Sequence, residues 1–296
     1  LLGMNLKITS FSHYPNLRTL IIRKSYDTRI PIPEDIGDLT NLTKLELLGV
    51  VTNFPLERLE NLEFLSIQGS SIDNHEAFFA RKINKLPNLE ELIMNFELHE
   101  FSAGDFPKLR KLQMEATMFN YDFEKIPNLS EIKINYPSYA TSDLSLSILK
   151  NLCKCIGLTK IYIINCLLKE IPPEIGNLVN LEELGLGGNR IPKVPKEIGN
   201  LVNLKYLDLS SNLISDLPNS ITNLVNLEKA LFIYNRELQA LVNDIAGRLV
   251  HLNDKNFLQL FSSSCIKRTH LYKAFQLNEN LSSTARRIHI HSKYTG

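Results

Sequence analysis

Between residues 171 and 235 one sequence pattern occurs three times, with a constant spacing of 23 residues. The three segments read IPPEIGNLVNLEELGLGGN, RIPKVPKEIGNLVNLKYLDLSSN and LISDLPNSITNLVNLEKALFIYN. A single unit of this length cannot bury its own apolar face, so a fixed period of this size predicts that similar units stack side by side. The less regular segments of the chain can therefore be aligned with this repeat, position by position.

Each copy places apolar residues at three fixed positions and ends on an asparagine. These anchors are Leu181, Leu184, Leu186 and Asn189; Leu204, Leu207, Leu209 and Asn212; and Leu227, Ala230, Phe232 and Asn235. The pattern, LxxLxLxxN, strongly resembles the leucine-rich repeat family. That resemblance implies an α/β repeat solenoid of horseshoe form, with parallel strands on the concave side and irregular, 3₁₀ or helical segments on the convex side.

The same motif continues upstream with less regular spacing. Its first leucines are Leu17, Leu42, Leu62, Leu89, Leu109, Leu129, Leu158, Leu181, Leu204 and Leu227, and an asparagine precedes eight of these ten. Alternating apolar and variable residues predict a short strand with one buried face. Residues 2–5 resemble the end of a further motif, so we expect about eleven repeats over 1–235, the first of them truncated. An array that opens inside a repeat suggests a fragment, because stacked repeats need a polar cap.

The segments between strands and after the last strand carry different signals. Pro-x-x-Ile-x-x-Leu, as in Pro172, Ile175 and Leu178, predicts 3₁₀ or extended turns. Helical spacing is visible over 73–85 and from Ser147 onward, and again over 236–252 and 257–275. We therefore expect 236–296 to form a helical C-terminal cap with a polar tail. Such a cap would cover the otherwise open edge of the last strand.

Composition narrows the classes of partner. Lys plus Arg (33) and Asp plus Glu (32) nearly cancel, which argues against a nucleic-acid-binding surface. No apolar run reaches the roughly 18 residues that a membrane-spanning helix needs. We interpret Cys153, Cys155, Cys166 and Cys265 as reduced thiols in a cytoplasmic protein, and as packing residues in preference to a metal site.

No pattern for catalysis stands out. Gly185-Leu186-Gly187-Gly188 lies in a repeat strand and does not lead into a helix, so it is not a dinucleotide-binding loop. Some bacterial leucine-rich repeat effectors carry a ubiquitin-ligase domain with a catalytic cysteine, and Cys265 invites that comparison. The tail is too short for such a domain and lacks a matching motif. We predict a protein that is not an enzyme, with no cofactor, metal or small-molecule substrate.

Side chains next to the inner leucines are expected on the concave face, where several aromatic and apolar groups would be exposed. Such residues often anchor interfaces. Gly185, Gly187 and Gly188 lack side chains and are expected to leave a depression between Tyr162 and Tyr206. The predicted partner-binding residues are Phe64, Glu91, Ile93, Lys160, Tyr162, Ile164, Tyr206, Asp208, Leu231, Ile233 and Tyr234. The alternative is that these are ordinary strand residues with high β propensity.

The regular repeats resemble those of Ras-scaffold proteins, plant intracellular receptors and bacterial proteins of Legionella and Leptospira. This resemblance implies a protein–protein interaction scaffold that acts as a monomer in the cytoplasm, for example as a bacterial effector in the cytoplasm of a host cell. A second class is a sensor or targeting domain of a larger receptor or enzyme, such as a plant-type intracellular immune receptor.

Overall fold

The computed structural model describes residues 10–23, 33–48, 55–68, 86–95, 106–115, 123–135 and 142–235, and Leu238. Its contacts divide the chain into two compact units, Leu1–Leu158 and Thr159–Gly296, here called unit 1 and unit 2. The helices expected at 73–85, 236–252 and 257–275 lie outside the described residues. So does nearly all of the expected C-terminal cap.

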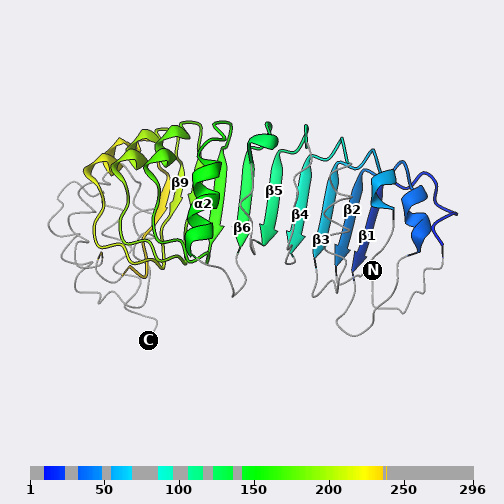
Figure 1. The fold of residues 1–296 in the computed structure, drawn as a ribbon, viewed down its shortest axis with the longest axis horizontal. Coiled ribbons are helices and arrows are strands. Elements are labelled where there is room, and N and C mark those ends of the chain that lie inside the picture. The colour runs from blue at the N-terminus through cyan, green and yellow to red at the C-terminus, as the bar shows by residue number, and fades with distance from the viewer. Residues whose placement is uncertain are drawn as a thin grey trace, which may run out of the picture. The chain divides into compact units, whose positions relative to one another are not determined.

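The described residues of unit 1 form six parallel strands that pair in chain order (Figure 1). They are β1 (Thr19–Arg23), β2 (Lys44–Leu48), β3 (Phe64–Gln68), β4 (Glu91–Asn95), β5 (Lys111–Glu115) and β6 (Glu131–Asn135). Between them lie the 3₁₀ turns η1 (Glu34–Asp38), η2 (Leu56–Arg58) and η3 (Phe123–Lys125).

Helix α2 (Ser142–Leu152) follows the last strand of unit 1 and contacts η3. We predicted this helix from Ser147 onward, so its first five residues were missed. The sequence at its start is Ser142-Asp143, and a small polar residue followed by an acidic one is typical of a helix N-terminus. The apolar spacing alone therefore placed the start too late.

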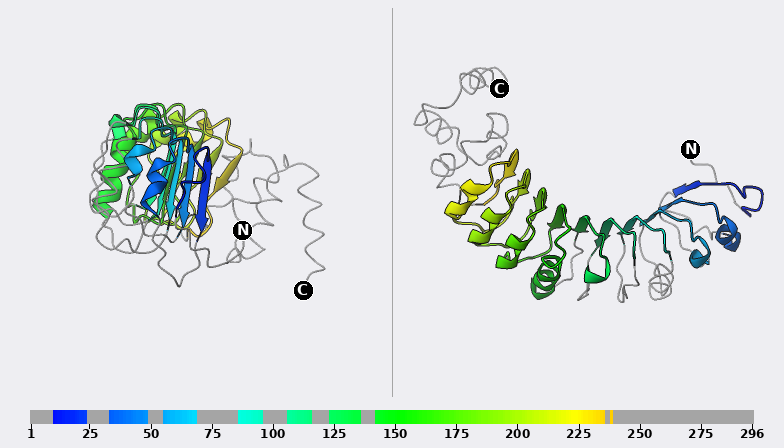
Figure 2. Two further views of the ribbon diagram at one scale, coloured as in Figure 1. Left: turned by 90° about the vertical axis from the view of Figure 1, so that its right-hand side faces the viewer. Right: turned by 90° about the horizontal axis from the view of Figure 1, so that it is seen from above.

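Unit 2, where the structure describes it, has four parallel strands, also paired in chain order. They are β7 (Lys160–Ile164), β8 (Glu183–Gly185), β9 (Tyr206–Asp208) and β10 (Lys229–Leu231). The 3₁₀ turns η4 (Pro173–Asn177), η5 (Lys196–Asn200) and η6 (Asn219–Asn223) stack on one another. They lie on the side opposite the strands (Figure 2). The predicted parallel strands and 3₁₀ turns are confirmed.

Proline determines where these 3₁₀ turns begin. Pro172, Pro195 and Pro218 are the N-cap residues of η4, η5 and η6, each with φ between −69° and −64°. Proline fixes φ in this range and lacks an N–H group that would go unpaired at a helix start. The isoleucine three residues later is fully buried in each turn: Ile175, Ile198 and Ile221.

The core of unit 2 is a set of stacked leucine columns. Leu184, Leu207 and Ala230 are paired in register across β8, β9 and β10, and none of them is exposed. Burying one leucine side chain contributes about 1.5–3 kcal/mol. Because every repeat adds the same column positions, each turn of the chain buries its apolar residues against its neighbours.

A buried asparagine closes each regular repeat. The Asn212 amide donates to the carbonyl oxygens of Leu186 (2.9 Å) and Leu209 (3.1 Å), and its Oδ1 accepts from the Ile191 N–H (3.0 Å). Asn189 and Asn235 make the corresponding bonds in their repeats. These bonds satisfy backbone groups that would otherwise be buried without partners.

A second row of asparagines, which precede the first leucine of each repeat, has its own structural role. Asn61 donates to the carbonyl oxygen of Thr40 (2.9 Å), the residue immediately before the preceding repeat's asparagine. The same bond, always to the residue just before the equivalent position in the preceding repeat, is made by Asn41, Asn88, Asn128, Asn203 and Asn226. The recurrence of asparagine at this position is visible in the sequence, and the structure gives the reason for it.

Candidate partner-binding site

We call the surface formed by the outward-pointing strand side chains of a unit its strand face. Of the predicted partner-binding residues, Phe64, Glu91 and Ile93 lie on the strand face of unit 1, on β3 and β4. The other eight lie in unit 2. The prediction that the apolar members are exposed is correct only for Tyr234; the rest are half-buried. Neighbouring side chains cover them, as when Lys44 Nζ lies 4.3 Å from the centroid of the Phe64 ring.

In unit 2 the ring of Tyr162 lies over Gly185, its register partner on the next strand. A Cβ atom on Gly185 would overlap this ring. The absence of a side chain therefore lets the tyrosine lie flat on the backbone of β8. The ring centroid of Tyr162 lies 6.4 Å from that of Tyr206, with a 42° angle between the rings. This separation is typical of a favourable aromatic pair.

The predicted depression at the glycines was therefore wrong, because neighbouring side chains fill it. Tyr162 covers Gly185, and the side-chain oxygen of Asn165 lies over Gly188, which has a φ of 71°. Asp208 and Ser210 approach Gly187, as described below. Side chains from the preceding and following repeats lie over these glycines, so the surface here is filled rather than hollow.

Charged groups hold both tyrosines in place. The Tyr162 hydroxyl forms a hydrogen bond with the Glu183 carboxylate, and Lys160 Nζ lies 2.8 Å from the other carboxylate oxygen. Burial by itself would raise the pKa of Glu183. Hydrogen bonds from Lys160 and Tyr162 outweigh this effect, so the pKa of Glu183 lies below its ordinary value. Glu183 therefore stays ionised and keeps these two bonds at neutral pH.

Tyr206 is the second fixed ring. Lys229 Nζ lies 5.5 Å from its centroid, within the range of a cation–π contact. Burial, together with the negative charges of Asp208 and Glu183, raises the pKa of Tyr206 to about 12. The hydroxyl is thus neutral at physiological pH.

Asp208 lies beside these rings, on β9. Its Oδ1 accepts hydrogen bonds from the Ser210 N–H (2.9 Å) and the Ser210 hydroxyl (2.6 Å). A Cβ atom on Gly187 would lie 3.1 and 3.3 Å from the two carboxylate oxygens. The carboxylate therefore extends over the backbone of the preceding repeat.

The last described repeat presents Leu231, Ile233 and Tyr234. Tyr234 is 50% exposed and has a φ of 61°, in the left-handed region. Asn165, Gly188 and Ser211 occupy the same repeat position and also have positive φ. Asparagine and glycine tolerate this conformation, whereas a bulky residue there is a genuine outlier. Tyr234 thus combines exposure with backbone strain.

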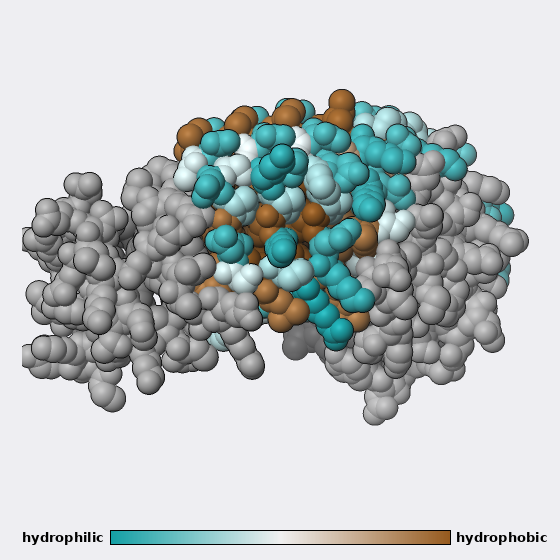
Figure 3. Space-filling view, turned by 60° about the vertical axis from the view of Figure 1, so that its left-hand side comes forward, coloured by the Kyte–Doolittle hydropathy of each residue, from teal (hydrophilic) through white to brown (hydrophobic). Residues whose placement is uncertain are grey.

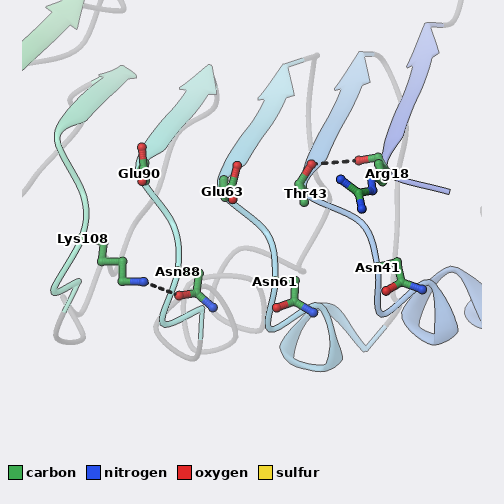
Figure 4. Close-up of a pocket in the computed structure, with 8 residues that line it drawn as sticks. All are labelled: Arg18, Asn41, Thr43, Asn61, Glu63, Asn88, Glu90 and Lys108. Atoms are coloured by element: carbon green, nitrogen blue, oxygen red, sulfur yellow. Dashed lines mark hydrogen bonds between the residues drawn. The ribbon is translucent and has the colours of Figure 1, made fainter. Parts of the chain in front are cut away.

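A groove in unit 1 was not predicted. It encloses about 350 Å³ and is lined by Arg18, Asn41, Thr43, Asn61, Glu63, Asn88, Glu90 and Lys108 (Figure 4). These residues stand immediately before or after the first leucine of successive repeats, so the Asn-Leu-x spacing was the signal that could have located them. Lys108 donates to Asn88 Oδ1 (2.7 Å), and Glu90 is paired with Arg110. Because its charges offset one another, the groove favours no ligand of a single charge.

Comparison with known proteins agrees with this geometry. The sequence model for the leucine-rich repeat matches residues 156–214 and 179–231. The fold is a leucine-rich repeat solenoid. No curated protein sequence matches the chain significantly.

Solved structures extend the likeness over most of the chain. A leucine-rich repeat protein of Leptospira interrogans is 20% identical, with a TM-score of 0.56, over 90% of this chain and 72% of that one. An internalin of Listeria monocytogenes is 17% identical, with a TM-score of 0.54, over 80% and 72%. The ectodomain of an Arabidopsis thaliana receptor kinase, solved in complex with CASPARIAN STRIP INTEGRITY FACTOR 2, is 23% identical, with a TM-score of 0.57, over 81% and 29%.

Other leucine-rich repeat positions add exposed apolar surface to unit 2. Val179, Val202 and Val225 occupy one repeat position and are 48%, 45% and 67% exposed. Figure 3 shows hydrophobic residues among hydrophilic ones on the side of the molecule in view. Single exposed valines are common on protein surfaces, so these residues do not by themselves mark a site.

The described ranges contain no group of three or more His, Cys, Asp or Glu residues that could hold a metal ion. In those ranges no helix is both long and apolar enough to cross a membrane. Cys153, Cys155 and Cys166 form no disulfide. Cys166 stands where the next repeat has its closing asparagine, Asn189. Burial raises the pKa of Cys166 to about 12, and its N–H donates to Asn189 Oδ1 (2.9 Å).

Proposed function

We propose that this chain is a protein-recognition scaffold that binds a partner protein on the strand face of unit 2. The observation that carries the proposal is the aromatic pair Tyr162–Tyr206, held in one arrangement by Gly185, Glu183 and Lys229. Tyrosines supply large contact area with few rotatable bonds, and they are enriched among the residues that dominate binding energy. Fixing them before binding lowers the entropy lost on association.

The surroundings of this pair support a protein partner. Half-buried apolar residues, Ile164, Leu231 and Ile233, lie on the same face as the charged residues Lys160 and Asp208. A mixture of aromatic, apolar and charged groups is typical of protein interfaces. The plant receptor ectodomain that shares this fold was solved in complex with another factor, which is consistent with a binding role for a solenoid of this kind.

We further propose that the scaffold is a monomer that acts in the cytoplasm, as an effector within a host cell. This part of the proposal rests on the resemblance of residues 171–235 to repeats of bacterial proteins. The strand face of unit 2 would then contact a host protein.

The test is an affinity capture from a eukaryotic lysate with the full chain and two variants. Tyr162→Ala/Tyr206→Ala removes the aromatic pair, whereas Lys111→Ala/Lys133→Ala alters strand-face residues of unit 1 and is the control. Mass spectrometry identifies captured proteins, and circular dichroism melting checks that both variants fold. We expect a protein retained by the wild type and the control but reduced at least tenfold by the tyrosine variant. Equal capture by all three, or no specific capture, contradicts the proposal.

A further inference from the structure

Asp208 differs from the other acidic residue on the strand face of unit 2. Glu183 is paired with Lys160 at 2.8 Å, and beside the face Glu182 is paired with Lys205 at 2.9 Å. Within residues 159–235, no lysine or arginine forms an ion pair with Asp208. The half-buried Asp208 carboxylate accepts two hydrogen bonds from Ser210 and one from Tyr206. A carboxylate can accept about four, so Asp208 keeps room for one charged donor.

The position of this carboxylate is fixed before any ligand arrives. Ser210 donates two hydrogen bonds to Oδ1, from its N–H and from its hydroxyl. The missing side chain at Gly187 leaves room for both carboxylate oxygens above the backbone of the neighbouring repeat. Two short bonds on one oxygen restrict rotation of the side chain, so the carboxylate offers a defined direction of approach.

The groups around Asp208 suit one kind of cation. Tyr206 lies two residues before Asp208 on β9. The ring of Tyr162, on β7, lies 6.4 Å from the ring of Tyr206. Leu231, the register partner of Asp208 on β10, supplies apolar surface. A guanidinium group can donate a charged hydrogen bond to a carboxylate while it stacks on aromatic rings, and its aliphatic stem packs on apolar groups. The compact ammonium of lysine can do only part of this.

We propose that the carboxylate of Asp208, above Gly187, is the docking position for an arginine side chain of the partner protein. This inference rests on the proposed function, since it names the chemistry by which the same face selects its partner. Arginine forms the charged pair with Asp208 and places its stem and guanidinium plane against Tyr162, Tyr206 and Leu231.

The test uses a library of random displayed peptides selected on the full wild-type chain, so that no partner needs to be known in advance. We expect the selected peptides to be enriched in arginine at one position. For one such peptide, replacing that arginine by glutamine, or Asp208→Asn in the protein, weakens binding about 10- to 100-fold, because a charged hydrogen bond is lost. Combining the two changes gives no further loss. Glu228→Gln, which removes an exposed negative charge from the same unit, is the control and binds as the wild type does.

The outcomes separate this inference from the function on which it rests. Peptides that bind on the tyrosine face but lack an enriched arginine, or an Asp208→Asn variant that binds like the control, overturn the arginine inference and leave the proposed function standing. A library that yields no peptide also overturns the arginine inference, while the affinity capture decides the proposed function separately. Since Asp208→Asn preserves the size of the side chain, and the peptide-side change leaves the protein untouched, misfolding cannot produce the expected result.

Discussion

The ring of Tyr162 lies directly over Gly185, so closely that a Cβ atom on the glycine would overlap the ring. The two residues are register partners on β7 and β8, and they are 23 residues apart in the chain. This contact explains how an aromatic side chain on the strand face is held flat, and it makes the site sensitive to a single methyl group.

Gly185→Ala is expected to lower the free energy of unfolding by about 1–3 kcal/mol, because the added methyl forces the ring from its position. It is also expected to weaken partner binding. Urea denaturation measures the first effect. Gly157→Ala is the matched control, since the nearest heavy atom to its Cβ would be 3.9 Å away. Equal stability of the two variants would show that Tyr162 does not occupy this place.

Asn212→Ala is expected to cost about 2–3 kcal/mol of stability, because it leaves the buried Ile191 N–H without a partner. It also removes one of the two asparagine amides that donate to the Leu186 carbonyl and one of the two that donate to the Leu209 carbonyl. The control is Asn203→Ala, which removes one exposed bond to the Val179 carbonyl, with an expected cost of about 1 kcal/mol since water can replace it. Urea titration of both variants gives the comparison. A similar cost for both would refute the distinction between the buried and exposed rows.

Tyr234→Asn is expected to be more stable than Tyr234→Ala by about 0.5–1 kcal/mol. Both variants remove the aromatic ring, but only asparagine tolerates the left-handed backbone at this position, where φ is 61°. Thermal unfolding followed by circular dichroism measures the difference. If alanine were the more stable of the two, the left-handed conformation would not be present in solution.

The ion pair at Glu183 predicts a pH dependence. The folded pKa lies below the ordinary value of 4.5, so the carboxylate favours the folded state above that pH. The contribution is lost as the pH falls through the folded pKa. Glu183→Gln should therefore lose stability relative to the wild type at pH 7 and approach it at pH 3, as measured by urea titration at both values. A constant difference between the two proteins would contradict the shift.

The three cysteines of the described residues, Cys153, Cys155 and Cys166, are expected to react with alkylating reagents in a fixed order. Burial raises the pKa of Cys166 to about 12, so almost no thiolate exists at pH 8. Cys153 is also buried, whereas Cys155 is partly exposed. Iodoacetamide labelling followed by peptide mass spectrometry should find Cys155 modified before the other two, and a urea-unfolded sample should lose this order. Early modification of Cys166 in the folded protein would refute the assignment.

The strands could be predicted because their signal is local. Pairs such as Leu184 and Leu186 alternate with variable residues, and burial of one strand face imposes that alternation directly on the sequence. The prolines before η4 to η6 act in the same local way. The predicted positions of all ten strand motifs are therefore confirmed by β1 to β10.

The surface could not be predicted to the same depth, because it depends on side chains from neighbouring repeats. Gly185, Gly187 and Gly188 predicted a depression, yet Tyr162, Asn165 and Asp208 from the preceding and following repeats cover them. Which way a side chain leans is decided by partners more than 20 residues away, and periodicity carries no information about rotamers. Whether the predicted residues bind a partner stays a prediction, with the arginine test as its sharpest form.

The exposed asparagine row has a consequence for how such a chain can change in length. The bonds of Asn61 and Asn88 span 21 and 28 residues, yet both are made at the start of a strand and to the same relative position in the preceding repeat. Residues gained or lost between two asparagines therefore leave the strand starts aligned. The repeats can therefore differ in length while the strands of the strand face keep their spacing.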